Sequence, residues 1–173
     1  RILIGQVYAT QNENEKAFGI FRDVIERDPT NVMAYSNLAS LNMRVDKPAD
    51  AIQILDAGLA KNPGDFGLRL IKAGIHELQQ DYDAAIAIYE ELLKERPNAD
   101  VVANNLASLL TDYGGDEASL KRAHELAVRF SSSNIPHFKD TLGWTYFRMG
   151  KVEEANELIK DVNKNMPDVP VFR

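Results

Sequence analysis

The sequence contains no cysteine, so it can form neither a disulfide nor a thiolate-ligated metal site. It has no stretch near the roughly 18 consecutive apolar residues that a membrane-spanning helix needs. Basic residues number 20 against 26 acidic ones, which gives a net charge of −6. Nucleic-acid affinity rests largely on clustered lysine and arginine. We therefore expect a soluble segment that neither enters a membrane nor binds nucleic acid, in a cytoplasmic or periplasmic compartment.

Residue groupings that would indicate catalysis are also missing. The three histidines are far apart in the sequence, and His124-Glu125 lacks the second histidine, at helical spacing, of a zinc-protease helix. Gly114-Gly115 is not followed by Lys-Ser or Lys-Thr, so it does not form a phosphate-binding loop of the known type. We expect no enzymatic activity, no cofactor and no metal.

What the sequence does contain is a period of 34 residues, set by Pro29, Pro63 and Pro97. Proline ends a helix because it lacks the N–H donor and clashes with the preceding turn. Small residues, which let two helices approach closely, recur at one position: Gly5, Ala39, Ala73, Ala107 and Gly143. A second small position follows and then a large apolar one: Ala17, Ala51, Ala85 and Ala155, with Phe21, Leu55, Tyr89 and Ile159.

Each repeat therefore predicts a helix A, a short turn, a helix B and a turn marked by proline. The predicted helices span residues 1–11, 14–28, 31–44, 48–61, 65–79, 82–95, 99–113, 117–131, 136–149 and 151–165. The fourth repeat is irregular, because it is 36 residues long, lacks the closing proline and contains the paired glycines Gly114-Gly115, which predict a surface loop. Asn31, Asp65 and Asp100 follow the turns and are predicted to cap the next helix A.

These positions resemble the tetratricopeptide repeat pattern over essentially the whole chain. The resemblance implies an all-α fold, a right-handed superhelical solenoid of about five antiparallel helix pairs. We expect a single domain over residues 1–173, with repeats at 1–31, 32–65, 66–99, 100–135 and 136–169 and the start of a further repeat at 170–173. Because both chain ends fall at the same phase of the repeat, we also expect a fragment of a longer array, of bacterial type.

The family implies a concave groove lined by the A helices, at the second, fifth, ninth, twelfth and thirteenth places of each repeat. In peptide-binding members, asparagines at neighbouring places on these helices grip the ligand backbone. The predicted partner-binding residues are Asn37, Ser40, Arg44, Asn104, Asn105, Ser108, Asp140, Trp144 and Arg148. The alternative for Trp144 and for the asparagines is packing or hydrogen bonding between adjacent repeats.

The resulting expectation is a non-catalytic scaffold that binds a peptide or a partner helix of unidentified origin in the concave groove. A clamp for a terminal carboxylate is not expected, because the inner helices lack the required lysine and arginine. The alternative function is a self-association or assembly module in a bacterial envelope or exopolysaccharide-export system. In that case uncapped ends of the array would form a homo-oligomer.

Overall fold

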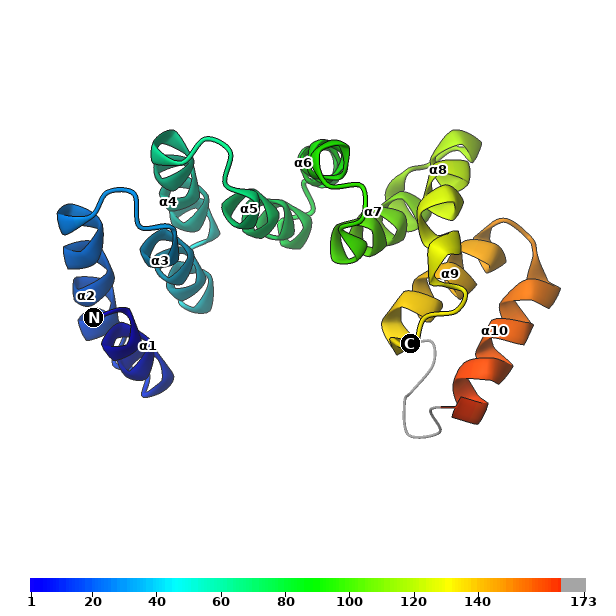
Figure 1. Ribbon diagram of the computed structural model, residues 1–173, viewed down its shortest axis with the longest axis horizontal. Helices are drawn as coiled ribbons and strands as arrows, with labels where there is room; N and C mark the ends of the chain where they lie inside the picture. The colour runs from blue at the N-terminus through cyan, green and yellow to red at the C-terminus, as the bar shows by residue number, and fades with distance from the viewer. Residues whose placement is uncertain (166–173) are drawn as a thin grey trace. The chain divides into compact units, whose positions relative to one another are not determined.

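The 34-residue period appears in the structure as a series of antiparallel helix pairs (Figure 1). The computed structural model describes the backbone of residues 1–165 and the side chains of residues 1–161. Only helices occur in this part of the chain, which confirms the all-α prediction; the further repeat predicted at 170–173 lies outside it. The helices are α1 (Ile2–Thr10), α2 (Asn14–Arg27), α3 (Val32–Arg44), α4 (Pro48–Lys61), α5 (Phe66–Leu78), α6 (Tyr82–Glu95), α7 (Asp100–Tyr113), α8 (Glu117–Ala127), the 3₁₀ helix η1 (Val128–Phe130), α9 (Pro136–Arg148) and α10 (Val152–Asn165).

The chain divides into two compact units, residues 1–88 and residues from 89 onward, with the boundary inside α6. In unit 1, α1 packs against α2 and α3 against α4, while α3 also contacts α2 and α1. In unit 2, α7 packs against α8 and α9 against α10, and α9 also contacts α7 and α8. A single domain over the whole chain stays a prediction.

The recurring small residues are buried where helices approach closely. Ala17, Ala39 and Ala51 have no exposed surface. At Gly5, a Cβ atom would lie 2.5 Å from Cε1 of Phe21, so only glycine fits without a shift of that ring. This confirms the close helix approach that the repeat pattern predicts.

The turn inside each hairpin contains a residue with a left-handed backbone conformation, which the sequence pattern does not predict. Asn12, Asp46, Gln80 and Gly150 occupy the same place and have φ angles of 60°, 57°, 62° and 76°. The next N–H bonds back over the turn to the helix, as in Lys47 N to Asn42 O at 2.9 Å. These are the features of a helix-ending Schellman motif. In the fourth repeat, Gly115 takes the left-handed conformation one residue later than in the others, with φ 75°.

Helix starts and ends agree with the predictions, with two corrections. The side chains of Asn31 and Asp65 cap the N-termini of α3 and α5, as predicted. The prediction for Asp100 is wrong, because Asp100 is the first residue of α7 and the N-cap is Ala99, which makes no side-chain hydrogen bond. The helix predicted over 117–131 ends at Ala127 and continues as the 3₁₀ helix η1. The tighter 3₁₀ turn buries Phe130, whose ring centroid lies 4.5 Å from that of Phe138.

Candidate partner-binding surface

Six side chains at helical spacing form two facing rows on α7 and α9, here called the α7–α9 surface. Residues four apart lie on the same face of a helix, one turn above the other. The two helices contact each other directly. The row on α7 is Asn104, Ser108 and Asp112, and the row on α9 is Asp140, Trp144 and Arg148.

A cluster around Asp112 joins the two rows at one end. Trp144 Nε1 donates a hydrogen bond to Asp112 Oδ1 at 2.7 Å, and Arg148 Nη1 lies 3.6 Å from the same oxygen. The Arg148 guanidinium carbon is 5.8 Å from the Trp144 ring centroid, and Phe147 stacks on the indole at 5.3 Å. Asp112 is not among the nine predicted residues, although it occupies the thirteenth place of its repeat, where groove residues are expected. The cluster fixes the indole on the unit 2 surface.

Beneath these rows, a buried hydroxyl pair holds α7 against α9. Thr111 Oγ1 and Thr145 Oγ1 are 2.9 Å apart, and both side chains are at most 1% exposed. Both hydroxyls also lie 2.7 Å from the carbonyl one turn earlier in their own helix. Because a hydroxyl has a single hydrogen, one of the two donates to the other, which in turn donates to its helix carbonyl. Because this buried pair fixes the register of α7 against α9, the two rows of side chains above it keep a constant relative position.

Asn104 is the polar side chain on this surface whose hydrogen bonding is incomplete. It is 8% exposed, and its Oδ1 is a buried oxygen without a hydrogen-bond partner in the described part of the chain. An unsatisfied buried polar atom costs about 1 to 3 kcal/mol. The neighbouring Asn105 differs, because its Nδ2 donates to the Tyr89 hydroxyl at 3.4 Å within unit 2. The two predicted asparagines therefore have different roles in the structure.

Asp140 lies on the same face of α9, two turns from Arg148. Burial raises the pKa of the Asp140 carboxyl above its ordinary value, and the nearby His137 offsets this rise only in part. The charged form is therefore disfavoured by loss of hydration. A cation from a binding partner would restore that lost stabilisation.

In unit 1, the predicted residues Asn37 and Arg44 make contacts within the fold. Asn37 accepts a hydrogen bond from Gln6 Nε2 at 2.9 Å and donates to Met33 O at 2.7 Å. Arg44 Nη2 donates to Asn14 Oδ1, at the first residue of α2, at 3.1 Å, and also to Ala9 O near the end of α1. Ser40 is exposed on α3. For these three residues, a role in binding a partner stays a prediction.

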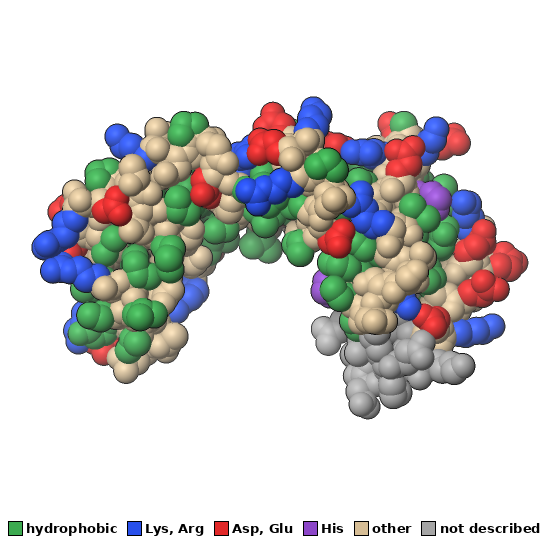
Figure 2. All heavy atoms as spheres, viewed as in Figure 1, with side chains coloured by type: hydrophobic (Ala, Val, Ile, Leu, Met, Phe, Trp, Pro, Cys, Tyr) green, Lys and Arg blue, Asp and Glu red, His purple; other side chains and the backbone are tan. Residues whose placement is uncertain are grey.

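Two apolar surfaces lie outside these rows. The first, the α1 face, is formed by Leu3, Ile4, Val7 and Tyr8, and hydrophobic side chains are visible there at the lower left of Figure 2. The second, the α9–α10 face, lines a hollow of about 330 Å³. It is formed by Trp144, Phe147, Val152, Ala155, Asn156 and Ile159. Trp144 thus borders both the α7–α9 surface and the α9–α10 face.

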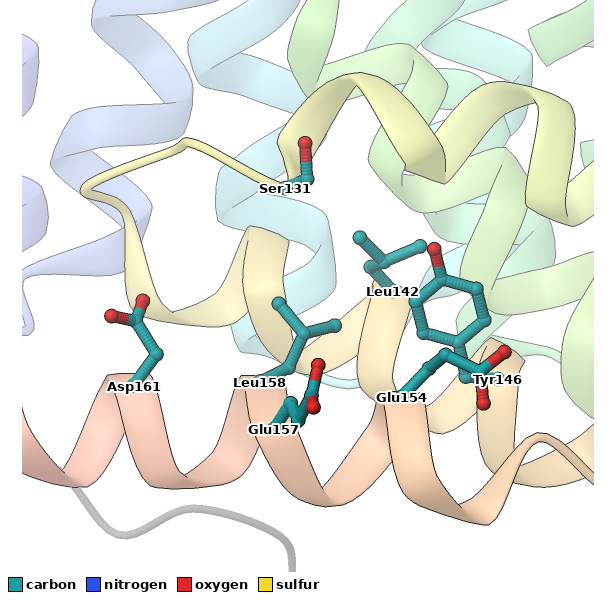
Figure 3. Close-up of a pocket in the computed structure, with 7 residues that line it drawn as sticks. All are labelled: Ser131, Leu142, Tyr146, Glu154, Glu157, Leu158 and Asp161. Atoms are coloured by element: carbon teal, nitrogen blue, oxygen red, sulfur yellow. The ribbon is translucent and has the colours of Figure 1, made fainter.

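A further hollow of about 390 Å³ lies between the end of η1 and α10, with an apolar floor and carboxylates at its rim (Figure 3). It is lined by Ser131, Leu142, Tyr146, Glu154, Glu157, Leu158 and Asp161. Acidic side chains also line the outer side of α10 at the right of Figure 2. Unit 1 has a hollow of about 290 Å³ in which Leu38 and Ile54 take the places of Leu142 and Leu158. Since both units have it, this hollow follows from how the repeats stack.

The described residues, 1–161 for side chains, contain no group of three or more histidine, aspartate or glutamate side chains placed to hold a metal ion. Within the same part of the chain, no helix combines the length and the apolar character required to cross a bilayer.

Comparison with known proteins matches a tetratricopeptide repeat family model to residues 36–100. Tetratricopeptide repeat protein 21B of Xenopus laevis is 31% identical over 170 residues, which cover 91% of this chain and 12% of that protein. The curated relatives that match share only a part of their length with this chain, from 12% to 53%.

Solved structures share the fold at low sequence identity. The crystal structure of MamA protein superposes with a TM-score of 0.76 at 18% identity, over 98% of this chain and 94% of that one. The crystal structure of YrrB, a TPR protein with an unusual peptide-binding site, gives a TM-score of 0.73 at 15% identity, over 96% of this chain and 85% of that one. Both are built from the helical repeats that the sequence pattern predicts.

Proposed function

The chain belongs to the tetratricopeptide repeat family, and we propose that it is a non-catalytic protein-interaction scaffold that binds a peptide segment on the α7–α9 surface. The family's repeats form helical scaffolds, and one structural neighbour, YrrB, has an unusual peptide-binding site. These comparisons support the class of function. The place of binding is argued from the residues of unit 2.

The observation that carries the proposal is the unpartnered Oδ1 of Asn104. A peptide contains a backbone N–H at every non-proline residue, and such a group can donate the bond that this oxygen lacks. Asn104 is 8% exposed, so a small rearrangement of its carboxamide accompanies binding. The hydrogen bond gained on binding offsets a cost that the free protein bears.

The flanking residues indicate the chemistry of the peptide. Asp140 is a partly buried carboxylate whose pKa is raised by that burial, which favours a lysine or arginine side chain opposite it. Trp144 and Phe147 form a stacked aromatic pair beside it, which suits an apolar side chain. We therefore expect the ligand to carry a basic residue near an aliphatic or aromatic one.

Selection from a displayed library of random linear peptides tests the proposal. Enriched sequences should combine a basic and an apolar residue, and a synthetic peptide of the enriched sequence should bind the purified chain in calorimetry. Asn104→Leu should weaken this binding by about tenfold, which corresponds to roughly 1.4 kcal/mol. Asp140→Asn should weaken it too and remove its dependence on salt.

The matched control is Asn42→Leu, since Asn42 is also a buried asparagine but donates to Leu38 O at 2.8 Å within α3. This variant should leave peptide affinity unchanged. If no peptide is enriched, or if enriched peptides bind Asn104→Leu and Asp140→Asn as tightly as the wild type, the α7–α9 surface is not the binding site.

A further inference from the structure

The two rows of the α7–α9 surface differ in the size and chemistry of their side chains. The row on α7 begins with Asn104 and Ser108, which are short and polar. The row on α9 consists of Asp140, Trp144 and Arg148, which carry a charge or a large ring. Short polar groups suit the backbone of a ligand, because each peptide unit offers hydrogen bonds. The surface therefore has one row for the backbone of a ligand and one row for its side chains.

The row on α9 is displaced along the helix axis relative to the row on α7. Trp144 follows Ser108 by 36 residues, the length of the fourth repeat, so the two occupy the same place in their repeats. The indole nevertheless bonds to Asp112, one turn further along α7. The same displacement sets Asp140 level with Ser108. Asn104 therefore lies about one turn before the point where the α9 row begins.

The buried oxygen of Asn104 restricts the conformation of the ligand. Its Oδ1 has no hydrogen-bond partner among the described residues, and the side chain is 8% exposed. Backbone N–H groups inside a ligand helix are already bonded to carbonyls of that helix. An extended chain instead leaves its N–H groups free for a neighbouring acceptor. A ligand that satisfies Asn104 through its backbone is therefore extended.

The spacing of the α9 row then determines which ligand residues face it. Residues four apart on a helix are separated by about 6 Å along its axis, because the rise is about 1.5 Å per residue. Alternate side chains of an extended chain point the same way and are separated by about 6.4 to 6.8 Å. The two spacings agree to within about 1 Å. Alternate residues of an extended ligand can therefore meet Asp140, Trp144 and Arg148 in turn.

The two ends of the α9 row carry opposite charges. Asp140 at one end is a partly buried carboxylate. At the other end, Arg148 Nη1 lies 3.6 Å from Asp112 Oδ1, which is beyond hydrogen-bond distance, and that oxygen already accepts the indole N–H of Trp144. A guanidinium has five N–H donors, so Arg148 retains donors for the carboxylate of a ligand.

We propose, on the basis of the function proposed above, that the ligand is an extended segment with a basic, an apolar and an acidic side chain at alternate positions. These contact Asp140, Trp144 and Arg148, in that order. The basic and acidic residues of the ligand are then four positions apart, with the apolar residue midway. The N–H that bonds to Asn104 lies roughly one or two residues outside the basic one, away from the apolar one.

Paired charge reversals measure this spacing. Asp140→Lys and Arg148→Glu are each titrated in calorimetry with the peptide enriched from the random library and with versions in which one charged residue is reversed. Each variant should bind the enriched peptide about tenfold more weakly and should regain affinity with one reversed version only. The two rescuing positions should lie four residues apart. Circular dichroism checks that both variants remain folded.

A different spacing would overturn the proposal without touching the proposed function. A helical ligand would place the two rescuing positions about eight residues apart, because the α9 row spans eight residues of a helix. Rescue at adjacent positions, or an enriched peptide without an acidic residue at this spacing, would also overturn it. In each case Asn104→Leu would still weaken binding, so the proposed function would stand.

The matched controls reverse an exposed charge outside the α7–α9 surface. Asp83→Lys on α6 repeats the charge change of Asp140→Lys, and Lys121→Glu on α8 repeats that of Arg148→Glu. Both controls should leave the affinity for the enriched peptide unchanged. A loss of affinity in a control as large as in its matched variant would show that net charge, not a local contact, governs binding, and would overturn the proposal.

Methylation of single backbone nitrogens in the peptide gives a second measurement that needs neither charged variant. Methylation just outside the basic residue should weaken binding to the wild type by about tenfold and should have no effect on binding to Asn104→Leu. No sensitive position, or loss of affinity at most interior positions as in a bound helix, would overturn the extended conformation. Wild-type affinity in Asn104→Leu would instead refute the proposed function and this proposal with it.

Discussion

The indole Nε1 of Trp144 donates to Asp112 Oδ1 at 2.7 Å, across the contact between two successive A helices. Arg148 approaches the same carboxylate from the next turn of α9. The bond directs the sole tryptophan of the chain toward α7, leaving its ring between the α7–α9 surface and the α9–α10 face. Trp144 thus borders both of these surfaces.

Removing this acceptor should be visible in the fluorescence of Trp144. In Asp112→Ala the indole loses its hydrogen-bond partner and Arg148 its nearby carboxylate, so the emission should shift and the free energy of unfolding should fall by about 1 kcal/mol. Asp112→Asn keeps an acceptor oxygen and should retain most of the wild-type spectrum. Identical spectra for the wild type and the alanine variant would show that the bond does not form in solution.

Asn104 and Asn42 form a matched pair for stability. Asn104→Leu removes a buried oxygen that has no partner among the described residues, so the free energy of unfolding should stay unchanged or rise. Asn42→Leu removes a satisfied hydrogen bond to Leu38 O and should lower it by about 1 kcal/mol. Urea unfolding measures both. A loss of stability in Asn104→Leu as large as in Asn42→Leu would show that Asn104 serves the fold rather than a ligand.

The stability contributed by Asp140 should depend on pH with a defined sign. Its folded pKa is raised above the ordinary value of 3.8, so the folded state holds the proton more tightly than the unfolded chain. The stabilisation that comes from this tighter proton binding is fully present below pH 3.8 and is lost as the pH rises through the pKa of the folded state. Asp140→Asn, which cannot ionise, should therefore gain stability relative to the wild type between acidic and neutral pH. Thermal unfolding at several pH values measures the difference in stability between Asp140→Asn and the wild type. A difference that stays constant with pH would contradict this prediction.

Much of the fold follows from sequence because its determinants are local and periodic. Proline, the recurring small residues and the large apolar position each act within one hairpin or between neighbours, and they predict the helices closely. The site is harder, because adjacent residues on a helix face different directions. Asn104 and Asn105 have the same chemistry, yet within the described residues the Oδ1 of Asn104 has no partner, while the Nδ2 of Asn105 donates to Tyr89. The pairing of Trp144 with Asp112 depends on the stacking of two repeats and has no local signal.

The left-handed turn residues are the clearest part of the fold that the sequence does not reveal. Gln80 has φ 62°, a conformation that costs a residue with a Cβ about 1 to 2 kcal/mol. Gln80→Gly should raise the free energy of unfolding by roughly 0.5 to 1 kcal/mol, because the added freedom of glycine in the unfolded chain offsets part of the gain. Gln79→Gly, at a φ of −83°, should give no such gain. Equal effects of the two substitutions in chemical unfolding would contradict the turn geometry.

Binding of a peptide through Asn104 on the α7–α9 surface can be followed directly in the side-chain carboxamide resonances of the ¹⁵N-labelled chain. These are followed while the peptide selected from the random library is added. At saturation the Asn104 resonances should shift strongly, with Trp144 Nε1–H shifting beside them, while those of the buried Asn42 stay in place. Saturable binding that leaves the Asn104 carboxamide unmoved would contradict the account.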